Sequence, residues 1–145
     1  MFSILRAGAL ALMGACSLPA FAESCYVSTE PAMAGPSGAH TQTCYEFQGT
    51  PEGAMDWSCN DTTKDVQKTH REKRASCPSG HFGRCVSALT QETLGNQASA
   101  GRKGEGVAPP QVGRDARLVT YYYQAQDKAQ SKTDCENAGG RWEAP

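Results

Sequence analysis

Large aliphatic side chains are scarce in this chain of 145 residues. Residues 23–145 hold no isoleucine and only three leucines, six valines and two phenylalanines. A share this low is usual in chains that remain disordered. The same residues hold five tyrosines, two tryptophans and six cysteines. We therefore expect a core built from aromatic rings, each burying about 150 to 250 Å², and from disulfides.

No apolar run is long enough to cross a bilayer as a helix, which takes about 20 residues. The longest run, residues 7–16, follows Arg6 and precedes an Ala-Phe-Ala sequence at residues 20–22. This pattern predicts an export signal over residues 1–22, cleaved at its end. We expect a periplasmic or secreted protein without a transmembrane segment. The alternative is a lipobox in which Cys16 carries a lipid anchor in the outer membrane.

The cysteines beyond this segment form an even set: Cys25, Cys44, Cys59, Cys77, Cys85 and Cys135. An even set in an exported chain is typical of a disulfide framework. Six cysteines allow 15 pairings, and the sequence does not choose among them. One bridge that would close the strand-like residues 25–50 joins Cys25 to Cys44. We expect residues 23–145 to form a single disulfide-rich domain.

Local patterns predict short strands and helices along this domain. β-branched and aromatic residues predict strands at residues 41–47 and 118–123, and a further strand is expected at residues 84–89, after the turn residues Pro78, Gly80 and Gly83. We expect the strands at 84–89 and 118–123 to pair antiparallel. A short helix is expected over residues 51–60, with proline in its first turn. A second helix is expected over residues 127–138, with Gly139 as its left-handed cap. The fold class is α+β: a small disulfide-stapled domain with a short antiparallel sheet and two or three short helices.

Two polar segments have no clear periodicity. Residues 60–76 mix both charges, with the basic residues gathered in the second half. The sequence favours a solvated helix or loop there, and the alternative is a basic patch for an acidic partner. Residues 91–117 are rich in glycine, alanine, glutamine and proline, and we expect them to form a flexible loop.

Several short motifs occur in an order that is similar to that of a known type of protein. They are Cys77-Pro78, the GxC sequence at residues 83–85, the three tyrosines at residues 121–123, and the CxxxGGxW sequence at residues 135–142. The chain resembles small exported bacterial cysteine-rich proteins with a C-terminal YY strand and a CxxxGGxW helix end. The likeness covers about the last 90 residues. It implies the same fold and no assigned activity, and this chain lacks the earlier GGxW that such proteins often carry.

The spacing of Cys77, His81 and Cys85 offers two thiolates and an imidazole, which are ligands that zinc takes. A fourth ligand is not evident. Exported cysteines are oxidised far more often than they bind metal. The sequence therefore favours disulfides at these positions and predicts no metal and no cofactor.

Sequence motifs of catalysis are also missing. There is no CxxC pair for a thioredoxin-like redox site, and no GxSxG or HExxH. A hydrolase needs a nucleophile, a base and an orienting group, whereas His40, His70 and His81 stand in polar, loop-like sequence. The sequence favours a non-enzymatic protein. The alternative is a small exported hydrolase or other periplasmic enzyme.

The strongest strand ends in Tyr121, Tyr122 and Tyr123, so Tyr121 and Tyr123 share one face and Tyr122 takes the other. The sequence favours a core role for these rings, and the alternative is a recognition surface. Fourteen basic and fifteen acidic residues nearly balance, which gives no reason to expect nucleic acid as a partner. We expect a binding or structural protein of the bacterial cell envelope whose partner is another envelope or secreted protein.

Overall fold

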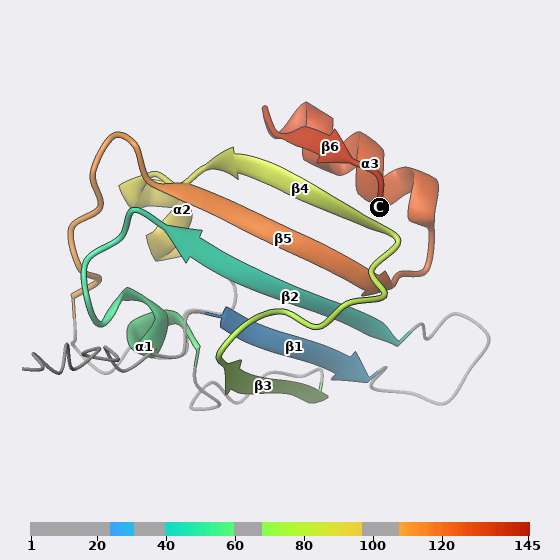
Figure 1. Cartoon of the computed structure of the whole chain (residues 1–145), viewed down its shortest axis with the longest axis horizontal. Coiled ribbons are helices and arrows are strands. Elements are labelled where there is room, and N and C mark those ends of the chain that lie inside the picture. The colour runs from blue at the N-terminus through green and yellow to red at the C-terminus, as the bar shows by residue number, and fades with distance from the viewer. Residues whose placement is uncertain (1–23, 31–39, 60–67, 97–107) are drawn as a thin grey trace, which may run out of the picture.

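The computed structural model describes residues 24–30, 40–59, 68–96 and 108–145. In chain order the elements are β1 (Ser24–Glu30), β2 (Thr41–Gln48), α1 (Ala54–Ser58), β3 (Lys68–Arg74), β4 (Gly83–Ala88), α2 (Gln91–Asn96), β5 (Arg117–Gln124), α3 (Lys128–Asn137) and β6 (Arg141–Glu143). The six described strands form one sheet of order β3-β1-β2-β5-β4-β6, and every neighbouring pair is antiparallel (Figure 1). The predicted small α+β fold with three short helices is confirmed. The predicted signal peptide, with Cys16, lies outside the described residues.

The strand register sorts the side chains into two faces, because directly opposed residues of neighbouring strands share a face. One row across the sheet contains, from β3 to β6, Glu72, Tyr26, Cys44, Tyr121, Arg84 and Glu143. The adjacent row contains Lys73, Cys25, Tyr45, Thr120, Cys85 and Trp142. We call the face of the first row the open face and that of the second the core face.

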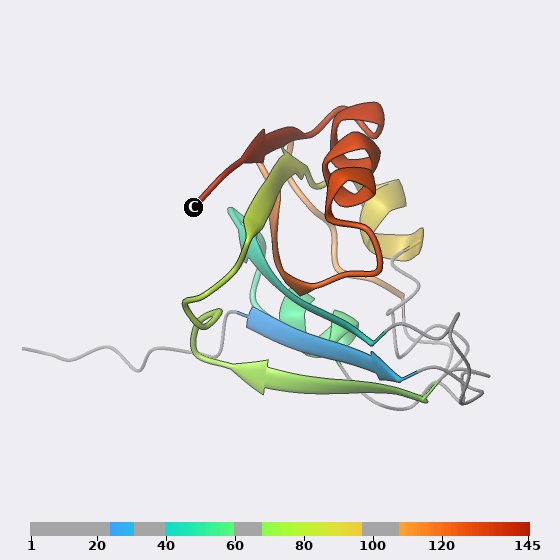
Figure 2. The same cartoon turned by 90° about the vertical axis from the view of Figure 1, so that its right-hand side faces the viewer.

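The described helices cover the core face only (Figure 2). Trp57 of α1 and Leu94 of α2 join Tyr45, Phe47 and Leu118 in one buried cluster. The aromatic core expected from the shortage of aliphatic residues is therefore present. No described helix is long and apolar enough to span a membrane.

The disulfides join Cys25 to Cys59, Cys44 to Cys77, and Cys85 to Cys135. The predicted disulfide framework is confirmed, and the Cys25–Cys44 bridge considered as one of the possible pairings does not form. Cys44 lies opposite Tyr26 in the register of β1 and β2. Cys25 is the neighbour of Tyr26 and so points to the other face of the sheet, since successive residues of a strand alternate.

The expectation of a helix or loop over residues 60–76 is wrong where the structure describes them, because residues 68–74 form the edge strand β3. β1 pairs with this strand along its whole length. Its charged side chains tolerate an edge position because they stay hydrated or find local partners. Lys73 binds Asp56 of α1, and Arg74 binds Glu72 at 2.9 Å.

The expected loop over residues 91–117 begins instead with helix α2. The Thr93 N–H donates to the Thr90 hydroxyl at 3.0 Å, and Leu94 is completely buried. The Gln91 side chain donates to the Pro110 carbonyl at 3.2 Å and accepts from the Val112 N–H at 3.1 Å. A helix therefore replaces the predicted loop at residues 91–96, whereas residues 108–116 contain no helix or strand and residues 97–107 lie outside the described part of the chain.

The other predicted elements are confirmed with small changes of boundary. β4 and β5 pair antiparallel as expected. Helix α1 begins at Ala54 instead of Pro51, because Gly53 makes a turn with φ at +87°. The Asp127 carboxylate caps α3 by accepting from the Gln130 N–H at 3.1 Å. Gly139 follows that helix with φ at +82°, as the sequence predicts.

Candidate functional site

A connecting segment crosses the open face of the sheet. Residues 75–82, here called the strap, run from the end of β3 across the sheet to β4 (Figures 1 and 2). The Cys44–Cys77 disulfide ties the strap to β2, and the Cys77 N–H donates to the Glu46 carboxylate at 3.0 Å. The Tyr123 hydroxyl donates to the Pro78 carbonyl at 2.5 Å. The strap is thus fixed to two strands, β2 and β5.

Aromatic rings gather beside the strap. The rings of Tyr26 and Tyr123 lie 5.7 Å apart between centroids. His81, in the strap, stands edge-on to Tyr121 at 5.0 Å and to Tyr123 at 6.4 Å. These four side chains, which we call the tyrosine patch, are each partly exposed. They come from β1, β5 and the strap, so only the tertiary structure assembles them.

Charged groups frame the tyrosine patch. The Arg74 guanidinium stacks 4.2 Å from the centroid of the Tyr26 ring. The Tyr121 hydroxyl donates to the Glu46 carboxylate at 3.3 Å. A stacked cation and an accepting carboxylate fix the orientation of two rings that remain partly exposed.

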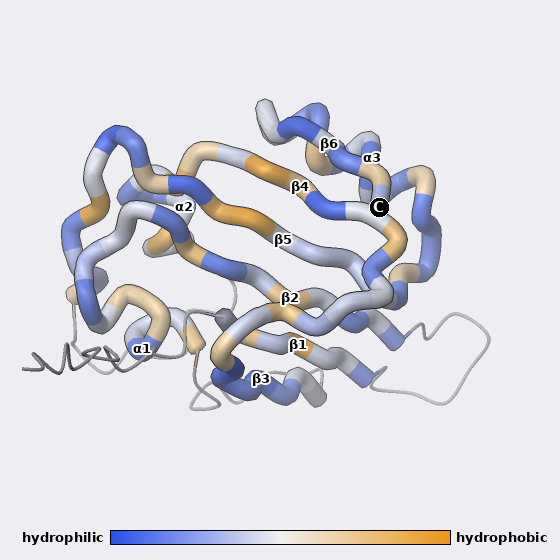
Figure 3. Tube along the Cα trace, in the orientation of Figure 1, coloured by the Kyte–Doolittle hydropathy of each residue, from blue (hydrophilic) through white to orange (hydrophobic). Residues whose placement is uncertain are grey.

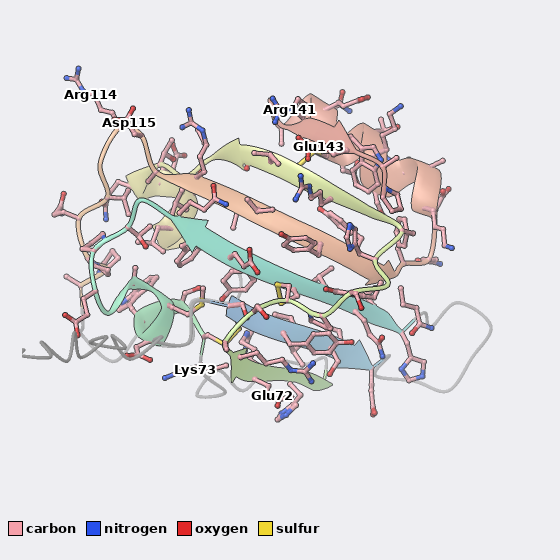
Figure 4. The ribbon with its side chains drawn as sticks, viewed as in Figure 1. Glu72, Lys73, Arg114, Asp115, Arg141 and Glu143 are labelled. Atoms are coloured by element: carbon pink, nitrogen blue, oxygen red, sulfur yellow. A yellow bond between two sulfur atoms is a disulfide. The ribbon has the colours of Figure 1, made fainter. Side chains whose placement is uncertain are left out.

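A second charged group lies at the β6 side of the open face. Figure 4 shows Arg141 and Glu143 together on β6. Arg141 donates to Glu143 at 2.6 Å, and Arg84 of β4 donates to the same carboxylate at 2.6 Å. The guanidinium of Arg141, followed by that of Arg84, lowers the pKa of the Glu143 carboxyl. Two arginines therefore share one ionised carboxylate here.

The three consecutive tyrosines divide between the faces, as their alternation predicts. Tyr121 and Tyr123 lie on the open face. Tyr122 lies on the core face, with its ring 5.3 Å from Trp142 and 6.1 Å from Phe82. Sequence reasoning did not find the other members of the site, Tyr26, Glu46 and Arg74. No local sequence pattern marks these residues. They lie on β1, β2 and β3, and only the order of the strands in the sheet places them near β5 and the strap.

The thiols of the zinc hypothesis are taken by disulfides. Cys77 bonds to Cys44, and Cys85 bonds to Cys135. Zinc binds cysteine as a thiolate, and neither sulfur is one here. The hypothesis of a zinc site at Cys77, His81 and Cys85 is therefore wrong. Within the described residues, no group of three or more His, Cys, Asp or Glu side chains is placed to hold a metal ion.

The three histidines occupy different places. His40 is exposed directly before β2, and His70 is exposed on β3. His81 is partly buried against the tyrosines, and its Nδ1 has no hydrogen-bond partner among the described residues. The imidazole of His81 therefore faces aromatic rings, not a carboxylate that would orient it as a base.

No protein-family model, curated protein or solved structure matches this chain. The site is therefore defined by its geometry: a sheet face free of described helices, three partly exposed tyrosines, a stacked arginine and a strap held by a disulfide.

We expect Tyr123 to ionise late in an alkaline titration of the folded protein. Burial, followed by the neighbouring hydroxyls of Tyr26 and Tyr121, raises the pKa of Tyr123 from 10.0 to about 12. A raised pKa means that the protonated Tyr123 contributes stability below pH 10. That contribution is lost as the pH rises toward 12. Tyrosinate absorbance measured against pH reports the ionisation directly.

Tyr123→Phe should remove a late-ionising component from this titration. The unfolded, reduced protein is the control, and its tyrosines should all ionise near their ordinary pKa of about 10. A folded protein whose five tyrosines ionise together at that pH would contradict the assignment.

Proposed function

We propose that this chain is an exported, non-enzymatic binding protein of the bacterial cell envelope, and that it binds a protein partner through the open face. The observation that carries the proposal is the tyrosine patch, with Arg74 stacked on Tyr26. Tyrosine and arginine are enriched among the residues that dominate protein interfaces. Tyrosine also offers a large contact area at a low cost in side-chain entropy.

Rigidity of the site supports binding. The Cys44–Cys77 disulfide and the hydrogen bond from Tyr123 to Pro78 hold the strap beside the rings. Contacts with Glu46 and Arg74 orient Tyr121 and Tyr26 before any partner arrives. A surface whose side chains are already ordered loses less entropy on association.

The cysteine chemistry supports export. Three disulfides form in the structure, and such bonds persist in the periplasm and outside the cell. The predicted signal over residues 1–22 agrees with that compartment. With their six sulfurs in disulfides, these cysteines offer no thiolate nucleophile.

A crosslinked pull-down from the natural host tests the proposal. The tagged protein and the single variants Tyr26→Ala and Tyr121→Ala are compared with Arg114→Ala and Lys132→Ala. The two control residues are exposed and lie away from the patch, in the turn before β5 and on α3. We expect one stoichiometric partner with the parent and both controls. Each patch variant should weaken its binding about tenfold or more.

Near-UV circular dichroism of every variant checks that the fold is kept. If the folded patch variants retain the partner as well as the parent does, the open face is not its binding surface. Robust turnover on peptidoglycan, peptide or ester substrates without any stoichiometric partner would instead favour the small exported enzyme.

A further inference from the structure

A cleft lies where strand β6 begins. It is lined by residues 86–88 of β4, by Arg117 of β5, and by residues 139–141, where the chain passes from α3 into β6. Its volume is about 360 Å³. Ligand sites in proteins usually measure about 300 to 1,000 Å³. The cleft therefore has room for a single side chain of a partner.

The cleft belongs to the open face. Val86 lies opposite Arg141 in the strand register, and Ala88 lies opposite Arg117. Alternation along the three strands places these four side chains on the same face as Tyr121. Figure 3 shows the apolar stretches of β4 and β5 side by side. The cleft thus combines two apolar side chains with two arginines.

Arg117 has no carboxylate partner among the described residues. Its side chain is exposed, and its Nη1 donates to the Ala116 carbonyl at 3.3 Å. None of the described ion pairs includes Arg117. The described lining of the cleft contains no acidic side chain either. The Nε and Nη2 groups of Arg117 are therefore available to a ligand.

Arg141 is only partly neutralised. Its Nε and Nη2 donate to Oε1 of Glu143, while Arg84 donates to Oε2 of the same carboxylate. One negative charge thus serves two guanidinium groups. The Nη1 of Arg141 has no partner among the described residues, and the side chain is 75 % exposed. Together with Arg117, this end of the open face keeps two positive charges in excess.

The cleft is continuous with the tyrosine patch. Arg84 lies opposite Tyr121 in the register of β4 and β5, and it shares Glu143 with Arg141. A protein that covers the tyrosine patch therefore reaches the cleft along β4.

We propose that the cleft binds a side-chain carboxylate of the protein partner, between Arg117 and Arg141. The inference rests on the proposed function and adds the chemistry by which the same face would recognise its partner. Arginine binds carboxylates through charge-assisted hydrogen bonds that are often bidentate. Val86 and Ala88 favour a small apolar residue beside the acidic one.

Neutral variants test the role of the two arginines in the crosslinked pull-down. We expect Arg117→Gln to weaken the binding of the partner about fivefold, and the double variant with Arg141→Gln to weaken it about tenfold or more. Arg114→Gln is the matched control, because Arg114 is exposed in the turn before β5 and does not line the cleft (Figure 4). This control should bind the partner as the parent does.

A second variant locates the carboxylate. Arg117→Lys keeps the positive charge and adds an amine, which a water-soluble carbodiimide joins to a neighbouring carboxylate through an amide bond. Peptide mass mapping should then find the introduced lysine joined to one aspartate or glutamate of the partner. Arg114→Lys carries the same amine outside the cleft and should not give this crosslink.

A peptide probe tests the cleft without the partner. It contains one glutamate between valines and has blocked ends, and its counterpart carries glutamine instead. Both are titrated into the isotope-labelled protein with its disulfides intact. We expect the glutamate peptide alone to shift the amide resonances of residues 86–88 and 139–141, and the Arg117→Gln, Arg141→Gln double variant to lose these shifts.

Several outcomes would overturn the inference. They are an absence of shifts at the highest soluble concentration of the glutamate peptide, equal shifts with the glutamine peptide, and equal binding of the partner by the double variant and Arg114→Gln. Failure of the proposed function has a different signature. In that case no stoichiometric partner is captured, or folded Tyr26→Ala retains it, whereas shifts with the glutamate peptide alone would still support the carboxylate site.

Discussion

Reduction of the disulfides is expected to unfold this protein. Each bridge closes a loop of 33 to 50 residues, and a loop of this size restricts the unfolded chain by about 4 kcal/mol in the chain-entropy model. A small domain has a total stability of only about 5 to 15 kcal/mol. Dithiothreitol should therefore abolish the near-UV circular dichroism. A near-UV spectrum that survives full reduction would contradict this expectation.

The three disulfides should be reduced at different rates. Cys25, Cys59, Cys85 and Cys135 are at most 8 % exposed, whereas Cys77 in the strap is partly exposed. Thiol–disulfide exchange requires access to a sulfur, so Cys44–Cys77 should be reduced first. Alkylation at increasing times followed by peptide mass mapping gives the order. Protein alkylated without reductant is the control, and its mass should not change.

Alanine in place of Gly83 or Gly140 is expected to destabilise the fold severely. A Cβ on Gly83 would lie 2.0 Å from the indole ring of Trp142. A Cβ on Gly140 would lie 2.6 Å from the sulfur of Cys85 and 2.9 Å from that of Cys135. Neither a buried disulfide nor a ring packed between neighbours moves easily. Overpacking of this kind costs about 3 kcal/mol, or roughly 10 °C in the melting temperature.

The matched controls are Gly95→Ala and Gly113→Ala, because a Cβ at either position meets nothing within 4 Å. Gly95 lies in α2, where alanine favours the helix by up to about 1 kcal/mol. Thermal and urea unfolding of the four variants gives the comparison. If Gly83→Ala unfolds at the same temperature as Gly95→Ala, the account of this packing is wrong.

These contacts also give a structural reason for the motifs that the sequence singled out. In the GxC sequence, the glycine leaves room for Trp142 and Cys85 bonds to α3. In the CxxxGGxW sequence, Gly139 takes the left-handed turn, Gly140 lies against the disulfide, and the tryptophan joins β6 to the core face. Every residue type in these motifs thus has a role in packing, which is why they point to a fold and not to a reaction.

Local patterns predicted the elements whose cause is local. The strands near residues 41–47 and 118–123 follow from their β-branched and aromatic residues. The C-terminal helix follows from its Asp127 cap and the turn at Gly139. β3 was missed because its residues are nearly all charged, and only the pairing with β1 makes them a strand. α2 was missed because its anchor is a single buried leucine, Leu94, and six residues give no visible period.

The sequence by itself determined that the chain would use disulfides and aromatic rings for stability, and that Tyr121 and Tyr123 would share a face. It did so because composition and the two-residue period of a strand are local properties. Only the tertiary structure decided which cysteines pair, and only it brought Tyr26, Arg74 and Glu46 to the same face as those tyrosines. The physical reason is register. A shift of one residue between two strands moves every side chain to the opposite face, and register depends on contacts between segments far apart in the chain.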